Sequence, residues 1–304
     1  PVERTSQDRA APAGAMLLPE PRPPVASDGG LAPFAVQGFW DAFESGAYDA
    51  LDRVRFLLTA AYLENPADPQ VTLLLAHAHL WSVSERARLD TPDPTITDHL
   101  VLADAYFEEA FRLAPQDARI IGWLGSSRLP LGDLRRDSVL VAEGHALLRE
   151  SVQRSPTFNH FTAGFILSSR PRASPEFADA VGQLWRNVDV CSGMRDASGG
   201  DAYEAALGVA VACANSEKAP HNYEGFMLTL GDVLLKDGRA DEGKAIYRRA
   251  QLAPAYETWP YRDVLEQRLV DADSLVAEWT SGRSEPEIVM GSAYTCTVCH
   301  QRAQ

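Results

Sequence analysis

Apolar residues recur at intervals of three and four along most of this chain, from about Phe34 to Gly282. This spacing places them on one face of an α-helix, whereas a half-buried strand would show strict alternation. Glycine, proline, asparagine and aspartate punctuate the pattern where turns are expected. No convincing alternating segment interrupts it. The sequence therefore predicts an all-α fold, in a chain of 304 residues that is long enough to bury a sizeable core.

Small and aromatic residues follow a fixed order within this helical region. Ala103, Phe107, Ala110 and Pro115 place a small residue, an aromatic, a second small residue and a closing proline in turn, and a Leu-Gly pair follows at 124–125. Three other segments carry partial copies of this order: Ala61, Pro66, Leu75 and Ala76; Leu230, Gly231, Tyr247, Ala250 and Pro254; and Leu148, Ser151 and Pro156.

This order resembles the tetratricopeptide repeat (TPR) family over roughly residues 45–270. The resemblance implies a TPR-like superhelix of helix hairpins. In such hairpins the small residues let two helices approach closely, the aromatic fills the gap between them, and the proline ends the second helix. Two stretches, Ser84–Thr97 and Asn187–Asp201, break the regular period. An irregular helical bundle is therefore the alternative.

The chain is strongly acidic, with 42 Asp and Glu residues against 28 Lys and Arg and a formal net charge of −14. It lacks the basic surface that nucleic acid or anionic lipid requires, and it favours a partner with a basic docking patch. The sequence contains no run of about 18 apolar residues, so we expect no transmembrane helix.

The residues Cys-Thr-Val-Cys-His at 296–300 form a C-x-x-C-H motif. Two intervening residues let both thiols reach the two vinyl groups on one edge of a porphyrin when the backbone makes a helical turn. The adjacent histidine can then ligate the iron. With Tyr294 two residues upstream, the segment resembles the haem sites of c-type cytochromes. The resemblance implies one covalent haem c, attached through Cys296 and Cys299, with His300 as the proximal iron ligand.

Three other interpretations of the motif remain open. A zinc site would need a fourth ligand, and the sequence has no second paired-ligand motif. A C-x-x-C redox pair normally begins a helix within a strand–helix unit, and no strand is predicted. A pattern this short can also arise by chance.

The remaining two cysteines, Cys191 and Cys213, form an isolated pair. Haem c is attached outside the cytoplasm in bacteria, where disulfides also persist. We therefore expect a Cys191–Cys213 disulfide and a periplasmic or extracellular location, with two separate buried thiols as the alternative. The sequence opens at Pro1 without a methionine, which suggests that a precursor was processed, although proline directly after a signal-peptidase cut would be unusual.

These observations divide the chain into three regions. Residues 1–33 form an extended arm rich in proline, alanine and glycine. Residues 34–282 form the TPR-like domain, and residues 283–304 form a haem-binding tail. Only four residues follow the motif in this sequence, so the haem pocket is expected to come from the helical body or from another chain.

A distal iron ligand would have to come from elsewhere in the chain or from a neighbour. The candidates are His77, His79, His99, His145, His160, His221 and Met290, and more remotely Met16, Met194 and Met227. Repeat register places His77 and His160 toward the concave groove, and Met290 is close enough to fold back over the ring. We favour these three, although each has an ordinary alternative as a buried helix residue or a hydrophobic anchor.

The leading function is that of a monohaem electron-transfer protein whose helical body docks a redox partner or another cytochrome. The alternative is a structural subunit of an envelope or extracellular assembly, such as a filament, in which the haem tail joins neighbouring subunits. Association through the N-terminal arm and the concave groove suits both. A haem enzyme such as a peroxidase would need distal acid–base groups that the sequence does not locate, so we expect no enzymatic activity.

Overall fold

The computed structural model describes residues 30–192 and 221–302. Over these ranges every regular element is helical and there is no strand, so the predicted all-α class is confirmed. The long helices are α1 (Ala32–Ser45), α2 (Leu51–Glu64), α3 (Pro69–Ser84), α4 (Asp98–Leu113), α5 (Ala118–Arg135), α6 (Ser138–Arg154), α7 (Pro156–Leu167), α8 (Pro175–Ser192), α10 (Tyr223–Asp237), α11 (Ala240–Ala250) and α12 (Arg262–Ser281). Single turns of 3₁₀ helix at Tyr48–Ala50, Arg86–Arg88 and Tyr256–Thr258, and the short α13 (Thr297–His300), complete the fold.

Local sequence signals set several helix boundaries. α3, α5 and α6 begin after Asp68, Asp117 and Asp137, whose side chains accept hydrogen bonds from backbone amides of the first turn. α10 and α12 end at Gly238 and Gly282, each in the left-handed conformation that glycine adopts without strain. The end of α12 therefore coincides with the predicted boundary between the helical domain and the tail.

At the other end of the helical domain, α1 begins at Ala32, inside the predicted arm, because Pro33 is tolerated in the first helical turn. Residues 1–29 of the arm lie outside the described ranges.

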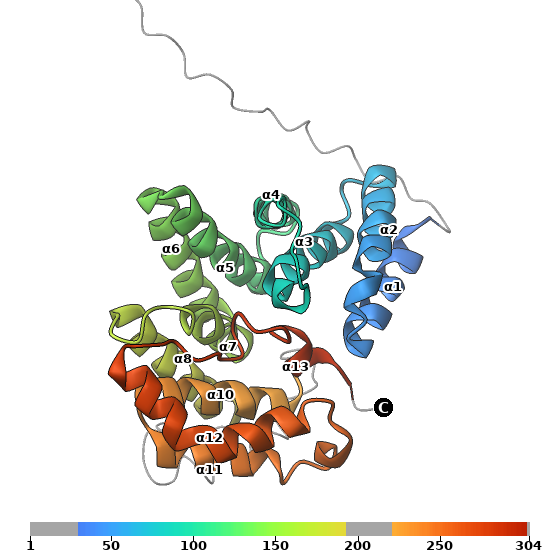
Figure 1. Ribbon diagram of the computed structural model, residues 1–304. Helices are drawn as coiled ribbons and strands as arrows, with labels where there is room; N and C mark the ends of the chain where they lie inside the picture. The colour runs from blue at the N-terminus through green and yellow to red at the C-terminus, as the bar shows by residue number, and fades with distance from the viewer. Residues whose placement is uncertain (1–29, 193–220, 303–304) are drawn as a thin grey trace, which may run out of the picture.

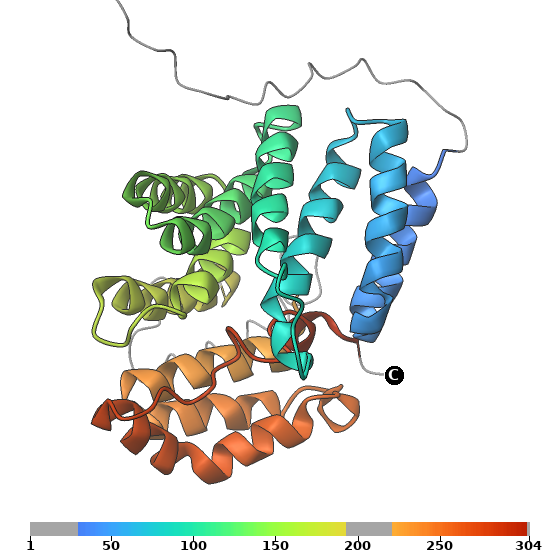
Figure 2. The same ribbon diagram turned by 45° about the horizontal axis from the view of Figure 1, so that its top comes forward.

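Neighbouring helices pack as hairpins, most extensively in the pairs α3–α4, α5–α6, α7–α8 and α10–α11. Figure 1 shows α1 to α6 forming one side of the molecule and α7 to α12 the other. The tail after α12 runs back between these two sides and brings α13 next to α1 and α10, an arrangement that is also visible in Figure 2.

Small residues allow the helices of each hairpin to approach closely. A Cβ added at Gly125 in α5 would lie 2.9 Å from the carbonyl oxygen of Gly144 in α6. One added at Gly231 in α10 would lie 2.1 Å from the ring of Tyr247 in α11. Positions predicted to be small or aromatic because of repeat spacing thus lie at helix contacts, as expected for close antiparallel packing.

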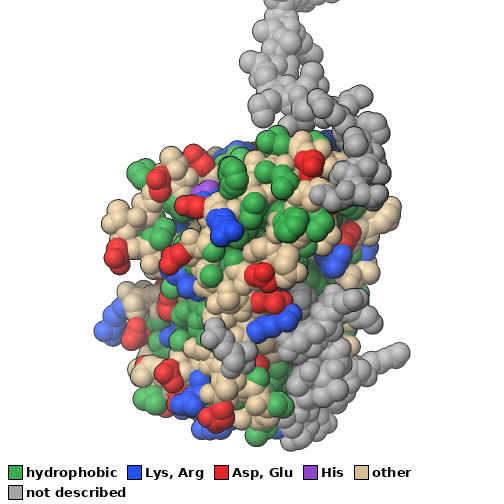
Figure 3. Space-filling view, turned by 90° about the vertical axis from the view of Figure 1, so that its right-hand side faces the viewer, with side chains coloured by type: hydrophobic (Ala, Val, Ile, Leu, Met, Phe, Trp, Pro, Cys, Tyr) green, Lys and Arg blue, Asp and Glu red, His purple; other side chains and the backbone are tan. Residues whose placement is uncertain are grey.

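The outer side of α1 and α2 exposes large apolar side chains. Phe34 and Phe56 are each 72% exposed and Leu63 is 71% exposed. Figure 3, which views this side of the molecule, shows hydrophobic side chains interspersed with charged ones. Among the described helices, none is both long enough and apolar enough to cross a bilayer.

Candidate functional site

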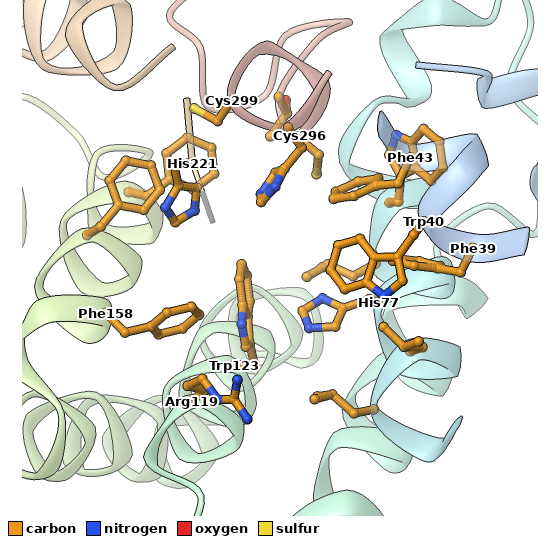
Figure 4. A pocket seen from close by; sticks show the side chains of 18 residues that line it. Phe39, Trp40, Phe43, His77, Arg119, Trp123, Phe158, His221, Cys296 and Cys299 are labelled. Atoms are coloured by element: carbon orange, nitrogen blue, oxygen red, sulfur yellow. The ribbon is translucent and has the colours of Figure 1, made fainter. Parts of the chain in front are cut away.

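A cavity lies between the two sides of the molecule. Its wall is largely aromatic and is formed by side chains of α1, α3, α5 and α7 together with the tail (Figure 4). The aromatic side chains are Phe39, Trp40, Phe43, Trp81, Trp123, Phe158, Phe161 and Phe165. This lining is typical of a pocket for a mostly apolar ligand.

All three functional residues of the C-x-x-C-H motif line this central cavity. Cys296 directly precedes α13, and the α13 turn brings Cys299 and His300 to the same wall. Both cysteines are free thiols, with Cys299 buried and Cys296 partly buried. The helical turn that the spacing predicts between the two thiols is therefore present. Figure 4 shows the two cysteines on one side of the cavity, and His77, Trp123 and Arg119 on the other.

A buried carboxylate holds the start of α13. Oε1 of Glu85 accepts hydrogen bonds from the amides of Cys296 (2.8 Å) and Thr297 (2.7 Å) and from the Thr297 hydroxyl (3.0 Å). Oε2 accepts from Nε1 of Trp81 (2.9 Å) and Nε of Arg88 (2.8 Å). Glu85 is fully buried, and these five bonds compensate for the loss of its hydration.

The opposite face of α13 rests on the start of α10. The backbone amide of Asn222 donates to the carbonyl oxygen of Cys299 (2.7 Å), and its side-chain Nδ2 donates to the carbonyl oxygen of Val298 (3.1 Å). Nε1 of Trp259 also donates to the Val298 carbonyl oxygen (3.3 Å). The backbones approach so closely that a Cβ on Gly225 would lie 2.4 Å from this oxygen.

Further contacts secure the chain on both sides of α13. Upstream, Oδ2 of the buried Asp232 accepts from the Val289 amide (2.9 Å), and Oδ1 pairs with Nε of Arg268 (3.2 Å). Downstream, Arg302 donates its amide to the Glu44 carbonyl oxygen in α1 (2.9 Å) and pairs with the Glu44 carboxylate (2.5 Å). The motif segment, residues 294–302, is thus fixed to the N-terminal and C-terminal sides of the fold at once.

Two further histidines line the cavity with His300. The His300 ring lies 4.6 Å from that of Phe43 and 4.9 Å from that of His221, between ring centroids. The His77 ring packs edge-on against Trp123, at 4.8 Å. Among the described residues, neither His77 nor His221 has a hydrogen-bond partner for its ring nitrogens.

Burial holds both of these imidazoles in the neutral form. It lowers the pKa of His77 to about 3, with a smaller contribution from His300. It also lowers the pKa of His221 well below the ordinary histidine value, again with His300 contributing. A neutral imidazole keeps the nitrogen lone pair that metal coordination requires.

The pKa values of both thiols are raised, whereas those of a reactive redox pair are lowered. Burial raises the pKa of Cys299 to about 12. Burial, followed by the charge of Glu85, raises the pKa of Cys296 well above its ordinary value. Reactive cysteines have lowered pKa values, so the geometry gives no support to redox thiols. Among the described residues, no group of three or more His, Cys, Asp or Glu is arranged to hold a metal ion.

The three favoured distal candidates lie in different surroundings. His77 lines the central cavity. Nδ1 of His160 is bonded to Oε1 of Gln183 (2.7 Å), and His160 does not line the cavity. Met290 lines an adjoining hollow that shares Trp123 and Cys296 with the cavity. Of the more remote candidates, Met227 is buried in the core around α10, and Met16 and Met194 lie outside the described ranges.

Three cavity or support residues were not singled out from the sequence. His221 is one histidine among several, Arg119 carries no motif signal, and Glu85 lies in the Ser84–Thr97 stretch that breaks the repeat period. That irregularity was the only available signal for Glu85. Cys191 is disulfide-bonded, while its predicted partner Cys213 lies outside the described ranges.

Comparison with known proteins identifies no relative: no protein-family model and no curated protein matches the chain.

Proposed function

We propose that this chain is a c-type monohaem protein that transfers single electrons, with a TPR-like helical body as its docking scaffold. One observation carries the proposal: Cys296, Cys299 and His300 line one cavity whose wall is otherwise mostly aromatic. The motif predicts covalent attachment, and the cavity offers the apolar surface that a porphyrin needs.

The donor set fits haem c. Two free thiols suit thioether bonds to the vinyl groups, and His300 suits proximal coordination of the iron. Arg119, which pairs with Asp117 at 2.6 Å, lines the wall away from α13 and could also contact a haem carboxylate there. A bound haem would accept and release one electron, because its iron alternates between the ferric and ferrous states.

The chain's own residues perform three tasks in this proposal. Glu85 and Asn222 hold the motif segment in register with the body. The aromatic wall excludes water from the porphyrin faces. His77 would be the favoured distal ligand, because it lines the cavity across from Cys296 and Cys299, whereas the His221 ring lies 4.9 Å from that of His300.

The close hairpin contacts at Gly125 and Gly231 support a TPR-like superhelix. The position of the motif segment between the two sides of the molecule supports the idea that it occupies the groove of that superhelix. The disulfide at Cys191 supports a periplasmic or extracellular location.

The first experiment is expression in a host that attaches haem c, followed by gel electrophoresis under denaturing conditions. Haem staining should persist on the denatured chain, and a reduced-minus-oxidised spectrum should show the α-band of haem c. Cys296→Ser combined with Cys299→Ser should abolish covalent staining, whereas Cys191→Ser serves as the control and should retain it. Absence of stain from the unmodified chain would refute the proposal.

The distal ligand can be tested separately by near-infrared and low-temperature EPR spectra. His77→Ala should change the axial-ligand signature, whereas His160→Gln should leave it unchanged. A change with His221→Ala and none with His77→Ala would transfer the assignment to His221.

A structural role in an assembly is the second candidate, favoured by the exposed Phe34, Phe56 and Leu63 on the outer side of α1 and α2. Residues 1–33 and this surface would then join neighbouring subunits. Deleting residues 1–33, or combining Phe34→Ser with Phe56→Ser, should reduce the oligomeric state measured by light scattering. An unchanged state with haem still attached would favour the electron-transfer function alone.

A further inference from the structure

A buried ion pair lies directly behind the motif segment, in the stretch that interrupts the repeats. Glu85 is fully buried, and the side chain of Arg88 is 27% exposed. Their Oε2–Nε distance is 2.8 Å. Two amides of the motif segment lie on the other carboxylate oxygen, 211 and 212 residues further along the chain.

Both oxygens of Glu85 accept hydrogen bonds, so a glutamine would keep one acceptor and turn its amide nitrogen toward the Trp81 and Arg88 donors. Burying a carboxylate is costly unless it is well paired, and here Arg88 is its partner, beside the peptide of Cys296. Arg88 also reaches the segment itself, because its Nη2 donates to Oγ1 of Thr297 (2.8 Å).

We propose that Glu85 positions the motif segment and lowers the reduction potential of the haem attached to it, with Arg88 acting in the opposite sense. This inference rests on the proposed haem function. Oxidised haem carries one more positive charge than reduced haem. A buried negative charge nearby therefore stabilises the oxidised form, and a positive charge stabilises the reduced form.

Both charges already act on the atom that would join the porphyrin. Burial raises the pKa of the Cys296 thiol most, the charge of Glu85 raises it further, and Arg88 lowers it. Screening is weak at this position, because water is excluded from Glu85. Glu85 thus both holds the motif segment through hydrogen bonds and places a negative charge beside Cys296.

Two substitutions give opposite expectations. Glu85→Gln keeps an acceptor for the Cys296 and Thr297 amides but removes the negative charge, so the potential should rise. Arg88→Met leaves Glu85 uncompensated, so the potential should fall. In each case we expect about a tenfold change in the ratio of oxidised to reduced protein at fixed applied potential, equivalent to about 59 mV for one electron.

Asp104→Asn is the matched control. Asp104 is also a buried carboxylate with an arginine and a hydroxyl as neighbours, Arg128 at 4.0 Å and Ser127 at 2.7 Å. None of these three residues lines the cavity. Its substitution should leave the potential unchanged.

The measurement is a spectroelectrochemical titration of holoprotein, with covalent haem content determined by pyridine haemochrome. Shifts of opposite sign for Glu85→Gln and Arg88→Met, with full haem content, would support the inference. Shifts of the same sign would indicate a general loosening of the pocket and would overturn it, as would potentials equal to that of the unmodified protein. Should Glu85→Gln fail to fold, a rise or no shift with Arg88→Met would still refute the inference. Absence of covalent haem from the unmodified chain would instead overturn the proposed function.

Discussion

Gly225 gives the sharpest test of how the motif segment is held. A Cβ at this position would lie 2.4 Å from the Val298 carbonyl oxygen and 2.8 Å from both Cα of Cys299 and Oδ1 of Asn222. The first two are backbone atoms, so no side-chain rotation can relieve the overlap. Gly225→Ala should therefore push the motif segment away from α10 by about an ångström.

The size of the effect follows from three contributions. Overpacking of this kind costs about 3 kcal/mol at the upper end of the usual range, because backbone must move. Loosening the two hydrogen bonds from Asn222 to Val298 and Cys299 costs about 2 kcal/mol more. The helix propensity of alanine returns about 1 kcal/mol. The free energy of unfolding should fall by about 4 kcal/mol.

Gly182→Ala in α8 is the matched control, because an added Cβ there has no neighbour within 4 Å. Helix propensity alone should raise its free energy of unfolding by about 1 kcal/mol. Denaturant titrations of both variants, followed by circular dichroism, measure the difference. If Gly225→Ala were as stable as Gly182→Ala, the close packing of α13 on α10 would be refuted.

Two other predictions concern the helical body. Burial lowers the pKa of Lys236 to about 8, below the ordinary lysine value of 10.5. The unfolded chain therefore binds more protons between pH 8 and 10.5, and the folded state gains stability as pH rises through that window. In Lys236→Met, free energies of unfolding measured across the same window should show no such gain. Gly231→Ala should destabilise the fold by about 2 kcal/mol, because the added Cβ would lie 2.1 Å from the Tyr247 ring. In a double-mutant cycle with Tyr247→Leu most of that cost should disappear, and a purely additive result would contradict the predicted contact.

The local features were accessible from the sequence because they depend on neighbouring residues. Helical spacing indicated the all-α class, and the spacing of Cys296 and Cys299 indicated the turn between them. The close contact of Gly231 with Tyr247 also follows from repeat order. Each of these depends on one helix or one hairpin.

The walls of the cavity could not be predicted in the same way. They depend on the rotation of each helix hairpin relative to the one before it, and these small rotations add up along the chain. Repeat register predicted that both His77 and His160 face the groove, yet only His77 reaches the cavity. Glu85 lies where the repeat pattern stops, so its contact with Cys296 had no periodic signal.

The bonds between Glu85 and the motif segment join positions 211 residues apart. Ribosomal synthesis proceeds from the N-terminus, so helices α1 to α8 are complete long before the residues that close the cavity exist. Until then Trp40, Phe43 and Trp123 line an open apolar surface. A chain that stops short of Cys296, or whose motif segment fails to dock, would keep that surface exposed and become a substrate for proteases and chaperones. Docking of the motif segment is therefore the last step that covers this apolar surface.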